Sequence, residues 1–154
     1  MRIVLILFLA TILFMSCQTK NESNNAVTKT KDLATELGAD DYGMKNYVIA
    51  FLKRGPYRDQ DSTEAANLQR AHMDNINRLA NEGFLIVAGP FLDDGEIRGI
   101  YIFNVSSIEE AEALTKTDPA IQAGRLEMEL HPWYGSAALM KVNEMHQKLA
   151  KKEF

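Results

Sequence analysis

The sequence predicts a small α+β domain, and three observations lead to this fold class. Short runs rich in β-branched and aromatic residues alternate with longer amphipathic runs between residues 45 and 151. Glycine, proline and aspartate separate most of these runs. The chain has 154 residues, 46% of them hydrophobic and 25% charged, which suits one domain core and not two large ones.

The first half of the domain is predicted as strand, helix, strand. Residues 45–53 (KNYVIAFLK) form a strand by their tyrosine, valine, isoleucine and phenylalanine content, and a Gly-Pro pair ends it. A helix over residues 61–82 begins with an aspartate that has a glutamate three residues later, and it stops at Gly83. Residues 84–91 form the second strand.

The second half is predicted as strand, helix, strand and a final helix. An Asp-Asp-Gly turn leads into a strand over residues 98–105. Two serines, each followed three residues later by a glutamate, start a helix that stops at Asp118-Pro119. A fourth strand covers residues 125–133, and an amphipathic helix covers residues 136–151. The order β-α-β-β-α-β is the ferredoxin-like arrangement.

Both faces of the predicted sheet are apolar, which leads us to expect a homodimer. In the first strand Val48, Ala50 and Leu52 oppose Tyr47, Ile49 and Phe51, and in the third Ile100 and Ile102 oppose Tyr101, Phe103 and Val105. Two helices cover only one face, and an open antiparallel sheet normally has a polar second face. A second copy packed sheet to sheet, with Tyr101 at the interface, is one cover, and the C-terminal helix is the alternative.

The first seventeen residues indicate export. Arg2 precedes an apolar run over residues 3–14, which has the length of a signal-peptide core and is too short to span a bilayer. The segment that follows, Phe14-Met15-Ser16-Cys17, resembles the lipobox of bacterial lipoproteins. The resemblance implies cleavage before Cys17, a lipid on its thiol and a lipid-anchored protein of the cell envelope. Gln18, in place of an aspartate, favours the outer membrane.

A polar segment separates Cys17 from the domain. Residues 18–30 (QTKNESNNAVTKT) are almost devoid of apolar side chains, so they are predicted to form a flexible tether. Residues 31–37, closed by Gly38, are predicted as a short helix. Beyond residue 17 the chain carries 16 basic and 21 acidic residues, a net charge of −5, which argues against a nucleic-acid partner.

Two residues of the predicted helices are candidates for a functional site. His72 lies in line with Leu68, Ile76 and Leu79 at helical spacing, so it points toward the sheet. It is either a functional group or a buried histidine satisfied by a backbone carbonyl. Asp118, just before a proline, is either a functional carboxylate or a helix terminator.

A second set of candidates lies on the fourth strand. Glu127, Glu129 and His131 alternate with apolar residues and share one face. They either line a cleft of the dimer or form the solvated face of an edge strand. The three histidines have no metal-binding spacing, the chain has no glycine-rich phosphate loop, and its one cysteine is assigned to the lipid. We therefore expect no metal and no cofactor.

Several of these residues occur together in one known family. The chain resembles the YCII-related family in a set of residues that occur in one consistent order. These residues are His72, Gly83, Gly89-Pro90, Asp94-Gly95, Ser107, Glu109-Glu110-Ala111, Asp118-Pro119 and Ala123-Gly124. The resemblance implies a ferredoxin-like fold in a dimeric α/β barrel. The family is also similar to muconolactone isomerase and includes a dehydrochlorinase that acts on a chlorinated hydroxyhydroquinone.

The resemblance also implies a site. It pairs the histidine of the first helix with the aspartate of the Asp-Pro motif, here His72 and Asp118. Ala120 stands where many members carry an aromatic residue, which predicts a wider or differently shaped pocket. A histidine oriented by a carboxylate can take a proton near neutral pH, without a cofactor.

The predicted organisation has four parts: a signal peptide (1–16), the lipidated Cys17 with a tether (17–43), a YCII-related domain (44–135) and a C-terminal amphipathic helix (136–154). The predicted function is a cofactor-free lyase or isomerase that acts on a small molecule. Two alternatives remain open from the sequence: a module that binds a small ligand without catalysis, and a partner that docks another envelope protein.

Overall fold

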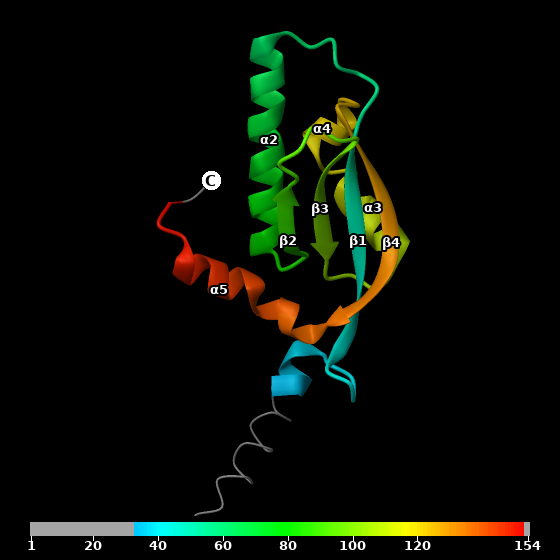
Figure 1. Cartoon of the computed structure of the whole chain (residues 1–154), viewed down its shortest axis with the longest axis vertical. Helices are drawn as coiled ribbons and strands as arrows, with labels where there is room; N and C mark the ends of the chain where they lie inside the picture. Colours follow the sequence, from blue (N-terminus) through cyan, green and yellow to red (C-terminus); the bar gives the residue numbers. More distant parts are fainter. Residues whose placement is uncertain (1–32, 153–154) are drawn as a thin grey trace, which may run out of the picture.

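The predicted β-α-β-β-α-β order is confirmed in the computed structural model, which describes residues 33–152 (Figure 1). The elements are β1 (Met44–Arg54), α2 (Ser62–Asn81), β2 (Leu85–Pro90), β3 (Ile97–Phe103), α3 (Ile108–Thr115), α4 (Pro119–Gln122), β4 (Leu126–Ser136), the 3-10 helix η1 (Ala137–Lys141) and α5 (Val142–Leu149). The four strands form one antiparallel sheet in the order β2-β3-β1-β4. This is the strand order of a ferredoxin-like fold.

The predicted signal segment, Cys17 and the polar residues 18–30 lie outside the described residues. Of the predicted short helix, residues 33–37 are described and are helical. This helix and the segment after it both contact the domain: Lys141 binds Glu36 at 2.8 Å, and the backbone N–H of Ala137 donates to the carbonyl of Gly43. Between residues 33 and 152, no helix has both the length and the apolar character needed to cross a membrane.

The predicted cap residues start both main helices. The Asp61 carboxylate accepts the backbone N–H groups of Thr63 and Glu64, which satisfies two donors at the start of α2. At the start of α3, Ser107 and Glu110 form a reciprocal capping box. These caps fix where each helix begins, and therefore where the side chains of α2 meet the sheet.

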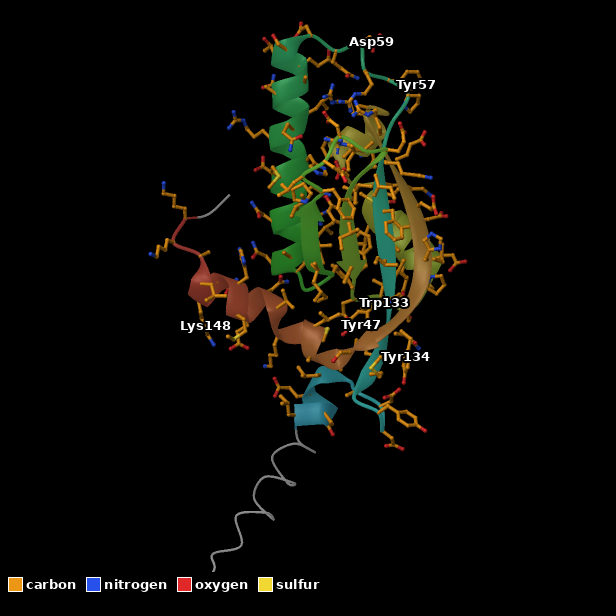
Figure 2. All side chains as sticks on the ribbon, in the orientation of Figure 1. Tyr47, Tyr57, Asp59, Trp133, Tyr134 and Lys148 are labelled. Carbon is orange, nitrogen blue, oxygen red and sulfur yellow. The ribbon has the colours of Figure 1, made fainter. Side chains whose placement is uncertain are left out.

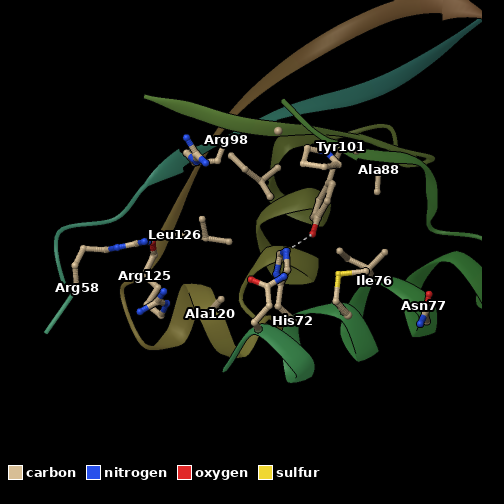
Figure 3. Close-up of a pocket in the computed structure, with 16 residues that line it drawn as sticks. Arg58, His72, Ile76, Asn77, Ala88, Arg98, Tyr101, Ala120, Arg125 and Leu126 are labelled. Carbon is tan, nitrogen blue, oxygen red and sulfur yellow. Dashed lines mark hydrogen bonds between the residues drawn. The ribbon is translucent and has the colours of Figure 1, made fainter. Parts of the chain in front are cut away.

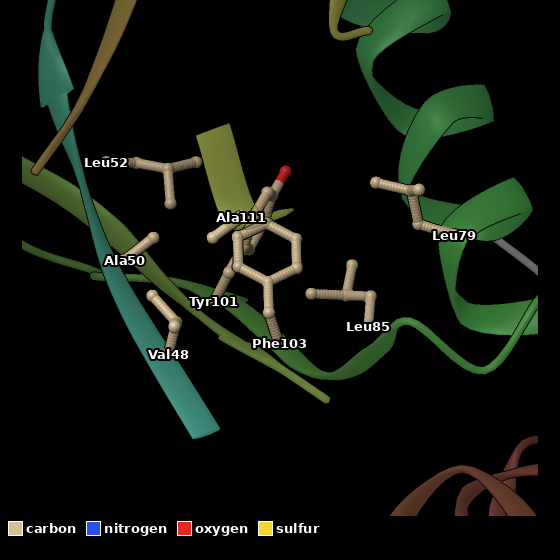
Figure 4. Close-up of a cluster of buried hydrophobic side chains, with 8 residues drawn as sticks. All are labelled: Val48, Ala50, Leu52, Leu79, Leu85, Tyr101, Phe103 and Ala111. Atoms are coloured by element: carbon tan, nitrogen blue, oxygen red, sulfur yellow. The ribbon is translucent and has the colours of Figure 1, made fainter. Parts of the chain in front are cut away.

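The main core lies between the sheet and its two helices (Figure 4). Its buried residues are Val48, Ala50, Leu52, Leu79, Leu85, Tyr101, Phe103 and Ala111. Alternate residues of β4 (Leu126, Met128 and Leu130) pack against the same core, as their alternation with Glu127, Glu129 and His131 predicts. The apolar set of β4 thus faces the helices and the polar set faces away from them.

The expected position of Tyr101 at a dimer interface is wrong. Tyr101 pairs directly with Ala50 across β3 and β1, so both side chains point to the helix-covered face. Tyr101 is only 2% exposed, and its ring packs nearly perpendicular to that of Phe103, with ring centroids 5.7 Å apart. Alternation along β3 separates its two faces but does not show which face the helices cover, because both are apolar.

The second face of the sheet is partly covered by the C-terminal segment. There Tyr47, Ile86 and Ile102 are buried, packed against Ile49, Val87, Leu139, Met140 and Val142. Figure 2 shows Tyr47 and Trp133 close together near this junction, with ring centroids 5.9 Å apart. The C-terminal segment, which the sequence left as the alternative to a second copy, therefore covers one end of this face. Farther along, Phe51 and Ile100 stay only half-buried.

The C-terminal segment differs from the single helix predicted over residues 136–151. β4 continues to Ser136, because Gly135 and Ser136 still pair with Lys45 and Met44 of β1. A 3-10 turn and the eight-residue α5 follow. The strand contains Pro132, which an edge strand tolerates because one of its sides needs no N–H donor.

Candidate active site

A buried histidine–carboxylate pair lies between α2 and the segment after α3. His72 points from α2 toward the sheet, as its helical spacing predicts, and is 7% exposed. Its Nδ1 atom lies 2.6 Å from Oδ2 of Asp118, whose side chain is fully buried. The two candidates that the sequence placed on separate elements are thus in direct contact.

Asp118 also has a structural role. Its second oxygen, Oδ1, accepts the backbone N–H of Ala120 at 2.8 Å and caps α4, which begins at Pro119. The sequence predicted only that the preceding helix stops at Asp118-Pro119. A proline favours the first position of a helix as much as it ends the previous one, so a short new helix begins there. The two carboxylate oxygens therefore have separate, fixed partners.

A polar network holds the segment before Asp118 against α2. One guanidinium nitrogen of Arg78 donates to Asn75 Oδ1 at 2.8 Å and to Thr117 Oγ1 at 2.9 Å. Thr117 in turn donates to the carbonyl of Leu114 at 2.7 Å. Because Thr117 precedes Asp118, this network fixes the backbone from which the carboxylate reaches His72.

Tyr101 completes the site from β3. Its hydroxyl oxygen lies 3.3 Å from Nε2 of His72, and the two rings are nearly parallel (dashed line in Figure 3). Burial, and after it the charge of Asp118, raise the pKa of the Tyr101 phenol well above its usual value. The phenol is therefore neutral at physiological pH. If the Asp118 carboxylate accepts Nδ1–H, then Nε2 carries the lone pair and accepts from the Tyr101 hydroxyl.

A cavity of about 500 Å³ lies beside His72 and Tyr101 (Figure 3). The apolar part of its lining comes from α2, β1, α4 and β4, with Met73, Ile76, Leu52, Ala120 and Leu126. Its polar lining includes Arg58, Arg98 and Arg125. This volume is in the range of sites that hold small organic ligands. Ala120 lines the cavity at the position where the family resemblance implied a different pocket shape.

Two glycines shape the wall that β2 and β3 form. A Cβ atom on Gly99 would lie 2.5 Å from the carbonyl oxygen of Gly89, so no larger residue fits there without a backbone shift. Both glycines line the cavity. The absence of side chains at this point leaves room beside the Tyr101 ring.

The polar residues of β4 do not line this cavity. Glu129 and His131 lie on the opposite face of the sheet, where His131 Nε2 is 2.8 Å from Glu129 Oε1. The Lys53 ammonium also binds Glu129, and this hydrogen bond, with that of His131, lowers the pKa of the carboxyl. Glu127 stands two residues before Glu129 and pairs with Lys53 in register. A role in a dimer cleft stays a prediction for these three residues.

Sequence reasoning missed Tyr101 and the three arginines as site residues. The only signal for Tyr101 was its pairing with Ala50, which follows from strand register and not from alternation. Arg58, Arg98 and Arg125 are 40 and 27 residues apart in sequence and lie in or beside loops, so no periodic pattern links them. Among residues 33–152, no group of three or more histidine, cysteine and acidic residues could hold a metal ion.

The fold and the site define a class: a ferredoxin-like domain with a buried histidine–aspartate pair beside a cavity between its first helix and the sheet. The YCII-related domain profile matches residues 49–134. The chain therefore belongs to the YCII-related domain family. This confirms the family that the sequence indicated.

None of the curated proteins matches the sequence. Among solved structures, the chain is similar to the 5-chloro-2-hydroxyhydroquinone dehydrochlorinase of Burkholderia phenoliruptrix, determined with 2,5-dihydroxybenzoquinone. The two share 18% sequence identity with a TM-score of 0.43, over 56% of this chain and 92% of the other.

Proposed function

We propose that the YCII-related domain of this protein catalyses proton transfer on a small molecule, in a lyase- or isomerase-type reaction that needs no cofactor. One observation carries the proposal: the imidazole of His72 contacts a fully buried carboxylate at 2.6 Å and also lines a cavity of about 500 Å³. A histidine held only for packing has no need of a cavity at its ring.

The proposed step begins with the lone pair of His72 Nε2. It takes a proton from a carbon next to a carbonyl group, and the electron pair of the C–H bond moves to the carbonyl oxygen as an enolate. Asp118 keeps the Nδ1–H tautomer and stabilises the imidazolium that forms. The neutral Tyr101 hydroxyl donates to Nε2 in the empty site; when Nε2 takes the substrate proton, this O–H is released and donates to the enolate oxygen.

The enolate then has two outcomes, and both balance without an oxidant or a reductant. In an isomerisation, the imidazolium returns the proton to another carbon of the same molecule. In an elimination, the electron pair expels a leaving group and the proton stays on His72 until solvent removes it. Each outcome uses the same base, so the geometry supports both reactions of this class.

Deuterium uptake tests the proposed base without knowledge of the substrate. Levulinate, phenylpyruvate and cyclohexanone are incubated with the protein in D₂O, and ¹H NMR follows the loss of signal next to each carbonyl. We expect the wild-type protein to accelerate exchange for at least one compound. His72→Gln should reduce that acceleration at least about 100-fold, the usual contribution of a general base.

The matched control is His146→Gln, because His146 is an exposed histidine on α5. This variant should accelerate deuterium exchange of the same compound as much as the wild-type protein does. If wild type exchanges none of the three compounds faster than His72→Gln does, the proposed function is contradicted.

We also propose that the protein is anchored to a membrane of the cell envelope. The apolar run over residues 3–14 and the segment Phe14-Met15-Ser16-Cys17 support a lipid anchor on Cys17, and Gln18 supports the outer membrane of the cell envelope. Two or more acyl chains hold a protein on a membrane stably, whereas one chain binds only weakly. Placed on such an anchor, the domain would act at a membrane surface.

The third part is a homodimer through the second face of the sheet. Phe51 and Ile100 on this face are only half-buried, and Trp133 is 36% exposed. Around them lie Lys53, Glu129 and His131, which can form the polar rim of an interface. The site beside His72 lies on the other face, so each subunit would keep its own cavity.

A further inference from the structure

Three arginines meet on one side of the cavity, although they come from three separate segments. Arg58 follows β1, Arg98 lies on β3 and Arg125 immediately precedes β4. Figure 3 shows the three on the same side, with His72 and Tyr101 nearer the centre. The apolar side chain of Ile76 lies on the opposite side of the cavity.

The backbone brings Arg58 and Arg125 together. The N–H groups of Gly55 and Tyr57 donate to the carbonyls of Arg125 and Gly124, at 2.9 and 3.0 Å. The approach is so close that a Cβ atom on Gly55 would lie 2.2 Å from the Gly124 carbonyl oxygen. Arg58 then extends this contact, because its guanidinium donates to the Arg125 carbonyl at 3.1 Å.

The positive charge of this cluster is largely uncompensated. Between residues 33 and 152, neither Arg58 nor Arg125 forms an ion pair with an acidic side chain. Arg98 pairs only with the exposed Asp94, at 3.4 Å, and the same nitrogen donates to the carbonyls of Asp93 and Gly95 at 3.2 Å. Arg125 donates to the neutral Gln60 at 2.7 Å. An arginine has five N–H donors, so most donors of Arg58 and Arg125 remain available.

The electrostatic environment is consistent with this arrangement. Burial, and then the charge of neighbouring arginines with Arg125 first, lower the pKa of the Arg58 guanidinium. Like charges that approach one another raise the free energy of the empty site, and a bound anion would relieve this repulsion. Planar guanidinium groups match a carboxylate with two parallel hydrogen bonds.

We propose that the cavity binds a small organic carboxylate, with its acid group on Arg58, Arg98 and Arg125 and its apolar body toward Ile76 and His72. The apolar lining argues for a hydrocarbon or aromatic body, which a simple inorganic anion lacks. The inference rests on the proposed function in one respect, that the end of the ligand beside His72 is the end that reacts.

Benzoate and benzamide are suitable probes, because they have nearly the same shape and differ in charge. Calorimetric titration of the full chain in detergent, with inorganic phosphate as a third probe, measures the three affinities. We expect benzoate to bind at least about tenfold more tightly than either benzamide or phosphate. Equal affinities for benzoate and benzamide would overturn the proposal, as would phosphate binding as tightly as benzoate.

Variants locate the binding to this cluster. Arg58→Gln and Arg125→Gln should each weaken benzoate binding about tenfold and leave benzamide binding unchanged. Arg58→Lys, which keeps the charge but loses the planar fork, should retain more affinity than Arg58→Gln. The control is Arg70→Gln, because Arg70 is exposed on α2 and does not line the cavity. An equal loss in this control would show a general charge effect and overturn the proposal.

The two proposals fail in different ways. Benzoate binding that depends on Arg58, without deuterium exchange of any carbonyl compound, would leave the carboxylate site standing and remove the proposed catalysis. Deuterium exchange of cyclohexanone that depends on His72, without a preference for benzoate over benzamide, would leave the proposed catalysis standing and remove the carboxylate site.

Discussion

His72 Nδ1 lies 2.6 Å from Oδ2 of Asp118, although 46 residues separate the two in sequence. The other carboxylate oxygen accepts the backbone N–H of Ala120, so neither oxygen can exchange its partner without breaking a hydrogen bond. An ionised carboxylate can only accept a hydrogen bond, so its contact with Nδ1 favours the tautomer of His72 that carries the proton on Nδ1. This relationship makes the tautomer of His72 a measurable consequence of the structure.

We predict that Asp118→Asn reverses the tautomer of His72. The N–H of Ala120 requires an oxygen acceptor, so the amide oxygen of the new asparagine faces Ala120 and its NH₂ group faces Nδ1. Nδ1 must then accept, and the proton moves to Nε2, which loses the lone pair that the proposed base needs. ¹⁵N NMR of the imidazole should show the change, together with a loss of deuterium exchange as large as in His72→Gln.

Asp74→Asn is the control for this experiment, because Asp74 is exposed on the same helix as His72. Its imidazole spectrum should match that of the wild type. If Asp118→Asn keeps the wild-type tautomer, the carboxylate does not determine the protonation of His72, and its assigned role is wrong.

A second prediction concerns Tyr101 at high pH. In the unfolded chain a phenol loses its proton near a pKa of about 10, whereas burial and Asp118 hold the folded pKa of Tyr101 higher. Below that pH both states are protonated and stability is unaffected. Above about pH 10 the phenol loses its proton more readily in the unfolded state than in the folded state. The free energy of unfolding therefore falls by up to about 1.4 kcal/mol per pH unit for this group.

Tyr101→Phe removes this titration. Urea unfolding between pH 8 and 11 should show a shallower alkaline loss of stability in the variant, with a residual slope because Tyr47 and Tyr134 also have raised pKa values. Near pH 7 the variant should lose about 0.5–1.5 kcal/mol, for one neutral hydrogen bond. Parallel alkaline slopes in the two proteins would contradict the prediction.

The β-α-β-β-α-β part of the fold was predictable because its local signals agree with the structure, whereas α4 and the C-terminal segment were not predicted. Caps at Asp61 and Ser107 start helices, Gly83 has a φ of 80° where α2 ends, and the strands have β-branched and aromatic residues. These are local signals, and they fix the order of the elements. The order then restricts the sheet to few arrangements.

The site was predictable only in part. The family pattern indicated His72 and Asp118, and their contact follows from α2 packing beside α4. The face on which Tyr101 lies depends on the register of β3 against β1, and a strand that is apolar on both faces carries no signal for it. The arginine cluster depends on backbone contacts between Gly55 and Gly124, which join segments far apart in the chain.

A third prediction tests the homodimer, now at Phe51 and not at Tyr101. The ring of Phe51 is half-buried on the second face and contacts His131, with ring centroids 5.8 Å apart. In a sheet-to-sheet dimer, Phe51→Glu would bury an unpaired charge, at a cost on the order of 3–5 kcal/mol. Analytical ultracentrifugation of the chain from residue 18 should show a dimer for wild type and a monomer for the variant.

Leu92→Glu is the matched control, because Leu92 is fully exposed in the loop between β2 and β3. This substitution adds the same charge outside the second face of the sheet, so it should leave the dimer intact. A wild-type protein that sediments as a monomer at micromolar concentration rules out the dimer proposal.

The last prediction concerns the anchor. Cys17 is the only cysteine of the chain, so its substitution removes the one thiol that can carry a lipid. In cells fed radiolabelled palmitate, wild type should become labelled and partition with membranes. Cys17→Ser should carry no label and should keep residues 1–16, since lipidation precedes cleavage in the lipoproteins that this segment resembles. Ser16→Ala retains a small residue before the cysteine and should behave as wild type, which separates loss of the thiol from a general disturbance of export. Equal labelling of wild type and Cys17→Ser would show that the lipid, if there is one, is attached elsewhere, and the proposed anchor would be wrong.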